Sequence, residues 1–170
     1  MQFTVGTTIV HPIYGVGNII KVEEKRFSEI KASLYYEIAL LRSTIWVPVK
    51  AQAAIGLRLV TPKSDLEQYR ELLKSPPSPP PSNDKPQVGR HMELAKLLKE
   101  GSFQVMCEVV RDLTLAGRQK PLGRSDATTL QKTRDRLLQE WAVSAEISET
   151  EAAEEINALL LTQETASNEK

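Results

Sequence analysis

The stretch that most constrains the fold is a hairpin signal at residues 10–17, which read Val-His-Pro-Ile-Tyr-Gly-Val-Gly. Apolar, β-branched residues flank it on both sides. Pro12 cannot donate a hydrogen bond to a central ladder, so it marks the end of a strand. Gly15 and Gly17 permit a positive φ or a close backbone approach in the return. The simplest interpretation is strand, tight turn, strand, at the start of a small antiparallel sheet, and a small barrel of no particular family fits the stretch alone.

The rest of the first 60 residues continues this β pattern. Residues 34–41 and 43–49 are rich in aromatic and β-branched side chains and predict two more strands, joined by a very short connection. Pro48 ends the second of them or lies at a sheet edge. We expect a polar loop at 25–31, one helical turn at 51–55 that ends at Gly56, and a last short strand at 57–60.

The periodicity changes at residue 64. Ser64 and Glu67 have the spacing of a capping box, which predicts a short helix from about residue 65 to 73. Residues 75–86 then contain six prolines in twelve positions, which excludes both a helix and a central strand. This composition predicts an extended, semi-rigid linker. A ligand for a proline-recognising domain is the alternative.

The chain after the linker has helical periodicity. A short amphipathic helix stops at Gly101, Ser102 caps a second helix that Gly117 ends, and a longer helix from Ser125 carries Trp141 on its apolar face. A second capping box at residues 148–151 opens the final helix. We expect these apolar faces to form a bundle core rather than a partner groove.

The predicted fold class is therefore α+β, with a small antiparallel β-barrel followed by an all-α helical bundle. Four segments follow from the changes of pattern: a β module, a short helix with the proline-rich linker, the bundle, and a disordered tail, at residues 1–62, 63–87, 88–162 and 163–170.

The formal net charge of zero hides an uneven distribution. Residues 85–136 hold eleven Lys and Arg against six Asp and Glu, whereas residues 137–170 hold one against eight. Only such a local excess bears on nucleic-acid binding. The single cysteine, Cys107, excludes an internal disulfide and lies in an apolar helical run, where a buried, inert thiol is expected. No apolar run approaches 18 residues and no signal-peptide pattern opens the chain, so we expect a cytoplasmic protein without membrane contact.

Several motifs together resemble a known family. A Val-x-Pro-x-x-Gly-x-Gly hairpin and an apolar strand ending in Val-Pro precede the linker, and the helical part contains Leu-Lys-Glu-Gly at 98–101 and Glu-Val-Val-Arg-Asp-Leu at 108–113. This arrangement resembles the CarD/CdnL family of bacterial transcription regulators over roughly residues 3–161. The first part also resembles the RNA-polymerase-interacting domain of the transcription-repair coupling factor.

The resemblance implies a Tudor-like N-terminal module that docks on the β subunit of RNA polymerase. The family's two basic contact positions fall on Lys25, which keeps the charge, and on Trp46, which does not. Arg26 and Arg42 are the neighbouring basic candidates. Strand alternation puts Ile45 and Val47 in the core and Trp46 on the other face, so we expect Trp46 to be at least partly exposed.

The resemblance also implies that the helical part lies near promoter DNA at the upstream edge of the transcription bubble. Family members carry a wedge Trp just before the first bundle helix, but here that position falls near Gln87 or Val88, and Trp141 is expected to be core. DNA contact would then be made mainly through phosphates, with an aliphatic wedge as a substitute. The predicted DNA-binding residues are Val88, Arg90, Arg118, Lys120 and Arg124.

Other function classes fit less well. The two histidines, His11 and His91, lie in different modules, and no metal-protease, phosphate-loop or nucleophile-elbow motif is present in the sequence. We therefore expect a monomeric, non-catalytic protein with no cofactor and no metal, and the resemblance implies the polymerase β subunit and promoter DNA as its partners. The alternative is a module that binds polymerase or another protein without touching DNA.

Overall fold

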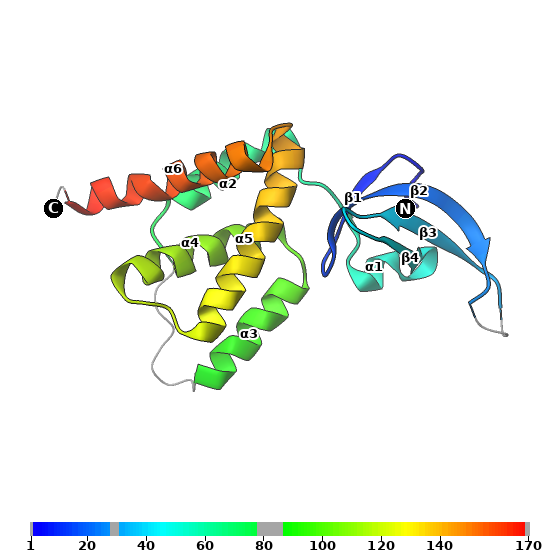
Figure 1. Cartoon of the computed structure of the whole chain (residues 1–170), viewed down its shortest axis with the longest axis horizontal. Helices are drawn as coiled ribbons and strands as arrows, with labels where there is room; N and C mark the ends of the chain where they lie inside the picture. The colour runs from blue at the N-terminus through cyan, green and yellow to red at the C-terminus, as the bar shows by residue number, and fades with distance from the viewer. Residues whose placement is uncertain (1, 28–30, 78–86, 169–170) are drawn as a thin grey trace. The chain divides into compact units, whose positions relative to one another are not determined.

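The computed structural model describes residues 2–27, 31–77 and 87–168, and for residues 87–91, 93 and 163–168 it describes the backbone alone. The chain divides into two compact units, residues 1–60 (unit 1) and residues 61–170 (unit 2). Unit 1 is a sheet and unit 2 is helical, which confirms the α+β class (Figure 1).

Unit 1 is one antiparallel sheet of five strands in the order β4-β3-β2-β1-β5 (Figure 1). Each predicted strand is present, and the second is longer than expected because it runs on into the predicted loop. The strands are β1 (Thr8–His11), β2 (Gly15–Lys25), β3 (Ser33–Ala39), β4 (Thr44–Pro48) and β5 (Arg58–Leu59).

The first hairpin has the predicted turn chemistry. Pro12 lies in the turn and Gly15 has a φ of 83°, a conformation that glycine adopts without strain. His11 holds the turn, because its Nδ1 accepts hydrogen bonds from the backbone N–H groups of Ile13 and Tyr14, at 3.0 and 3.3 Å. Gly17 is required for a different reason: a Cβ there would lie 2.6 Å from Cγ2 of Ile38 on the neighbouring strand.

The expected closure into a barrel is wrong, because the described strands form an open sheet with β4 and β5 at its two edges. The connection between these strands is helical, with η1 (Val49–Ala51) and α1 (Gln52–Ile55). Val49, Ile55 and Leu57 from this connection pack against the buried face of the sheet. The core is thus covered by a helical segment, and β5, with two residues, is too short to close a barrel.

In its described residues, unit 2 contains η2 (Lys63–Asp65) and five α-helices: α2 (Leu66–Lys74), α3 (Gln87–Lys99), α4 (Phe103–Gln119), α5 (Arg124–Ala145) and α6 (Glu149–Asn168). In Figure 1, α2 and α6 lie side by side, and α5 lies against α4. The final helix continues past residue 162, where the sequence pattern places the end of the bundle.

Two of the three predicted helix caps are confirmed. The Ser102 hydroxyl accepts from the Val105 N–H, and the Ser148 box is reciprocal, since Ser148 accepts from the Glu151 N–H while Glu151 accepts from the Ser148 N–H. The box at Ser64 is wrong: a 3₁₀ turn precedes α2, whose N-cap is Asp65 without a side-chain cap.

The predicted helix stop at Gly117 is also wrong. Helix α4 continues to Gln119, and the side chain of Leu122 from the following turn packs over Gly117. Gly117 therefore provides a close contact within the helix rather than a cap.

Helix α2 belongs to the core of the helical unit. Leu66 and Leu73 are fully buried in one cluster with Phe103 and Trp141, although the sequence pattern groups this helix with the linker. The chain enters unit 2 at Thr61, which is fixed to α5 through both its backbone and its side chain. Glu140 accepts from the Thr61 N–H and hydroxyl, at 3.0 and 2.9 Å, and Ser144 donates to the Thr61 carbonyl.

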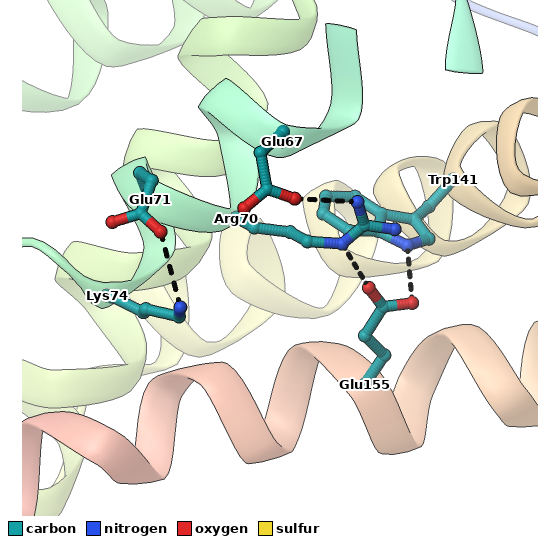
Figure 2. Close-up of polar contacts among 6 residues, drawn as sticks. All are labelled: Glu67, Arg70, Glu71, Lys74, Trp141 and Glu155. Carbon is teal, nitrogen blue, oxygen red and sulfur yellow. Dashed lines mark hydrogen bonds and ion pairs between the residues drawn. The ribbon is translucent and has the colours of Figure 1, made fainter. Parts of the chain in front are cut away.

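A polar network joins α2, α5 and α6 beside this core (Figure 2). Glu155 accepts from Nε of Arg70 with one oxygen, at 2.6 Å, and from the indole N–H of Trp141 with the other, at 3.2 Å. Arg70 also pairs with Glu67 and lies 5.9 Å from the Trp141 ring. The hydrogen bond to Glu155 raises the pKa of the Arg70 guanidinium. Trp141 is thus a core residue with a satisfied N–H, as predicted.

Candidate functional site

The face of the unit 1 sheet opposite its core is the candidate docking surface. Residues that are directly opposite in antiparallel strands share a face. The register pairs Lys21 with Glu37 and Glu37 with Trp46, and it pairs Tyr36 with Val47 on the buried side. Trp46 is 41% exposed and Val47 is 3% exposed, so the alternation predicted for this strand is confirmed.

Four residues on this face form a cluster of aromatic rings around one cation. We call Lys25, Phe27, Tyr35 and Trp46 the aromatic cluster. Nζ of Lys25 lies 4.4 Å from the Trp46 ring centroid and 5.8 Å from that of Phe27. The Phe27 and Tyr35 rings form a T-shaped pair with centroids 4.9 Å apart, and the Phe27 centroid lies 6.3 Å from that of Trp46. The structure therefore brings the two predicted contact residues, Lys25 and Trp46, together.

The charge on Lys25 has intramolecular partners. Its Nζ lies 3.4 Å from a carboxylate oxygen of Glu23, which is two residues earlier on the same face of β2. Cation–π attraction to Trp46 adds to this ion pair. Lys25 is consequently less available as a free charge than the sequence suggests.

The other two predicted contact residues do not both join the cluster. Arg26 is exposed and lies next to Lys25 in the chain. Arg42 is exposed in the turn between β3 and β4, whereas Lys25 pairs with Ser33 at the opposite end of β3. The structure thus separates Arg42 from Lys25 along the strand direction.

The strand that carries Trp46 is also an edge strand. β4 pairs with β3 on one side and with no other strand in the described part of the chain. Edge strands present unpaired backbone groups to which a partner strand can add. This edge and the aromatic cluster are adjacent, so one partner segment could use both.

Sequence reasoning missed Phe27 and Tyr35 as members of the cluster. Phe27 falls in a stretch that its polar neighbours identify as a loop, and Tyr35 is only one of several aromatic residues in its strand. The alternation that exposes Trp46 could have placed Tyr35 on the same face, because Tyr35 pairs with Pro48, two residues beyond Trp46.

A second candidate site lies in unit 2, at the turn from α4 to α5. Arg118, Lys120 and Arg124 are all exposed within seven residues of chain around this turn. Arg118 also donates to the Leu160 carbonyl of α6 at 3.2 Å, so it has a structural role as well. The remaining two are surface cations on either side of Gly123.

Other members of the basic segment are not surface charges. Arg111 is buried, pairs with Asp112 at 2.8 Å and donates to the Leu72 carbonyl and to Ser75, so its role is structural. Arg136 is half-buried, and burial lowers the pKa of its guanidinium. The side chains of the predicted DNA contacts Val88 and Arg90 lie outside the described residues, although both belong to α3.

Comparison with known proteins identifies both units. The family model described as "CarD-like/TRCF RID domain" matches residues 3–61, and the model described as "CarD, C-terminal domain" matches residues 69–157. A Bacillus subtilis (strain 168) protein named "Putative transcription factor YdeB" is 28% identical over 149 residues, which cover 87% of this chain and 95% of that protein. Among the helices that the structure describes, none has the length and apolar character needed to span a membrane.

Proposed function

This chain belongs to the CarD family of transcription regulators, and from that premise we propose that it docks on the β subunit of RNA polymerase and modulates the stability of open promoter complexes. Membership supports a transcription-related role that involves RNA polymerase. We propose the bacterial cytoplasm as its location, since RNA polymerase works there, and the proposal needs no catalytic step, cofactor or metal.

The observation that carries the proposal is the exposed aromatic cluster beside a free sheet edge, within the unit that matches the CarD-like/TRCF RID domain. A large indole that is 41% exposed on a strand is the kind of residue that concentrates interface energy. We assign polymerase contact to Lys25 and Trp46, with Arg26 and Arg42 at the margins of the same surface.

Titration of the full chain against the isolated β subunit tests this proposal. Trp46→Ala is expected to weaken binding by about tenfold or more, as for other interface anchors. Ile13→Ala is the matched control, because Ile13 is an exposed apolar residue of the same unit that lies in the β1–β2 turn. Equal affinities for wild type and Trp46→Ala, or no binding of the wild type, would reject the docking surface.

We propose further that unit 2 contacts promoter DNA through the phosphates, with Lys120 and Arg124 as its cations. The family's wedge Trp is absent, so the contact should be largely independent of sequence and steeply dependent on salt, with each neutralised phosphate adding about −0.9 to the log–log slope. Val88 and Arg90 remain proposed contacts from α3.

Open-complex lifetimes at several salt concentrations provide the test. The double variant Lys120→Gln/Arg124→Gln should shorten the lifetime and flatten its salt dependence, whereas Lys132→Gln, an exposed cation farther along α5, should change little. If neither variant alters the lifetime at any salt concentration, the alternative of a polymerase-binding module without DNA contact is favoured.

A further inference from the structure

The charges on the docking face are neutralised within the chain. On β2, Lys21, Glu23 and Lys25 alternate on this face, and each lysine has a carboxylate partner. Nζ of Lys21 lies 4.0 Å from an oxygen of Glu37, and Nζ of Lys25 lies 3.4 Å from an oxygen of Glu23. Among the described residues of these strands, both lysines that share a face with Trp46 therefore lie beside a carboxylate of the same chain, which reduces their need for a countercharge on a partner.

Two large aromatic residues of this face are exposed. Phe27 is 61% exposed and Trp46 is 41% exposed, and the side chain of Lys25, the cation of the aromatic cluster, is 29% exposed. Exposed aromatic residues that touch one another favour an apolar contact, because their burial removes a large hydrophobic area from water. Lys25 contributes by orienting the indole, because its ammonium group lies over that ring at 4.4 Å from the centroid.

We propose that Phe27 and Trp46 contact an uncharged, apolar side chain on the polymerase segment that binds at the β4 edge. In this arrangement Lys25 is a positioning residue for Trp46 rather than a charge that pairs with the polymerase. This inference rests on the proposed polymerase docking and specifies its chemistry. Charge complementarity argues for it, since a carboxylate on the partner would have to displace Glu23 from Lys25.

Binding of the full-length chain to the β subunit at about 0.1 M and about 0.5 M salt tests the proposal, since surface charge pairs are screened over this range. Phe27→Ala should weaken binding by about tenfold at both salt concentrations. Lys25→Met keeps the stem and removes the cation, and it should weaken binding by a smaller factor that salt does not change. Lys25→Arg restores a cation over the ring and should restore the affinity.

Lys21→Met is the matched control, because Lys21 is an ion-paired lysine of the same face and strand that has no aromatic partner among the described contacts. It should bind as the wild type does. A loss of affinity for Lys25→Met that disappears at high salt, or wild-type affinity for Phe27→Ala, would overturn the proposed apolar contact and leave polymerase docking intact. Absence of wild-type binding at both salt concentrations would overturn the docking itself.

Discussion

At the scale of single residues, Gly17 is the position where one added carbon has the clearest consequence. A Cβ there would lie 2.6 Å from Cγ2 of Ile38, 2.9 Å from a methyl of Leu40 and 3.1 Å from the Ala39 carbonyl oxygen. The atoms that would have to move include the backbone carbonyl of Ala39, so Gly17→Ala should lower the free energy of unfolding by about 1–3 kcal/mol. Thermal unfolding measures this cost.

Gly123→Ala serves as the control for that substitution. Apart from its chain neighbours, no atom lies within 4 Å of the position its Cβ would take, so the change should cost less than about 1 kcal/mol, chiefly because alanine is a weaker N-cap of α5 than glycine. Equal losses for the two variants would show that the close approach of β2 and β3 at Gly17 is not what makes glycine necessary.

The buried thiol of Cys107 predicts a loss of stability at alkaline pH. Burial, assisted by the carboxylates of Glu140 and Glu108, raises the pKa of this thiol above its ordinary value of 9.0. Above about pH 9 the folded state therefore keeps a proton that the unfolded state loses. The contribution of the protonated thiol to the free energy of unfolding is complete below about pH 9, and it is lost by about 1.4 kcal/mol per pH unit as the pH rises further.

Urea unfolding at about pH 8 and about pH 10 tests this linkage in wild type and Cys107→Ala. The wild type should lose more stability than the variant over this interval, because the variant lacks the titrating group. Parallel losses in the two proteins would mean that the thiol does not contribute.

Local side-chain patterns were the most predictable part of this molecule. The exposure of Trp46 follows from strict alternation along one strand, and the cap at Ser102 follows from short-range chemistry. Ser64 has the same spacing to Glu67 as a working capping box, but the 3₁₀ turn at residues 63–65 shifts the helix start past it. A cap depends on backbone dihedrals that the spacing alone does not determine.

At the scale of elements, a buried arginine ties the end of α2 to α4. Arg111 of α4 donates to the Leu72 carbonyl at 3.3 Å and to the Ser75 hydroxyl at 2.7 Å, and it pairs with Asp112. Arg111→Met removes these charged hydrogen bonds, although the Leu72 carbonyl still accepts from the Ser75 N–H and hydroxyl, and it should cost about 1–3 kcal/mol. Arg124→Met, at an exposed position, should cost less than about 0.5 kcal/mol by the same denaturant titration. A cost for Arg111→Met that matched this control would contradict the anchoring role.

Long-range packing explains where the sequence failed to predict the elements. The alternation of unit 1 identifies strands but not whether the two edge strands meet, and here Val49, Ile55 and Leu57 cover the core where a barrel would close. The change of pattern grouped the helix after residue 64 with the proline-rich linker, and the structure buries its Leu66 and Leu73 against Phe103 and Trp141. Contacts between residues far apart in sequence decided both outcomes.

At the scale of the whole molecule, the two units have different proposed partners: unit 1 binds RNA polymerase and unit 2 contacts DNA. Unit 1 presents a neutral, aromatic face beside a free strand edge, and unit 2 presents exposed cations at the α4–α5 turn. Screening by salt affects these surfaces differently, because apolar burial is much less salt-sensitive than phosphate contact. Polymerase affinity and open-complex lifetime should therefore respond to salt independently.

The most direct test of the account is hydrogen–deuterium exchange of the full-length chain with and without the polymerase β subunit. Binding at the proposed surface should slow exchange at residues 25–27 and in β4, while exchange at the α4–α5 turn stays unchanged in the absence of DNA. Slowed exchange confined to unit 2, or no change anywhere in the chain, would contradict the claim that the open sheet docks on RNA polymerase.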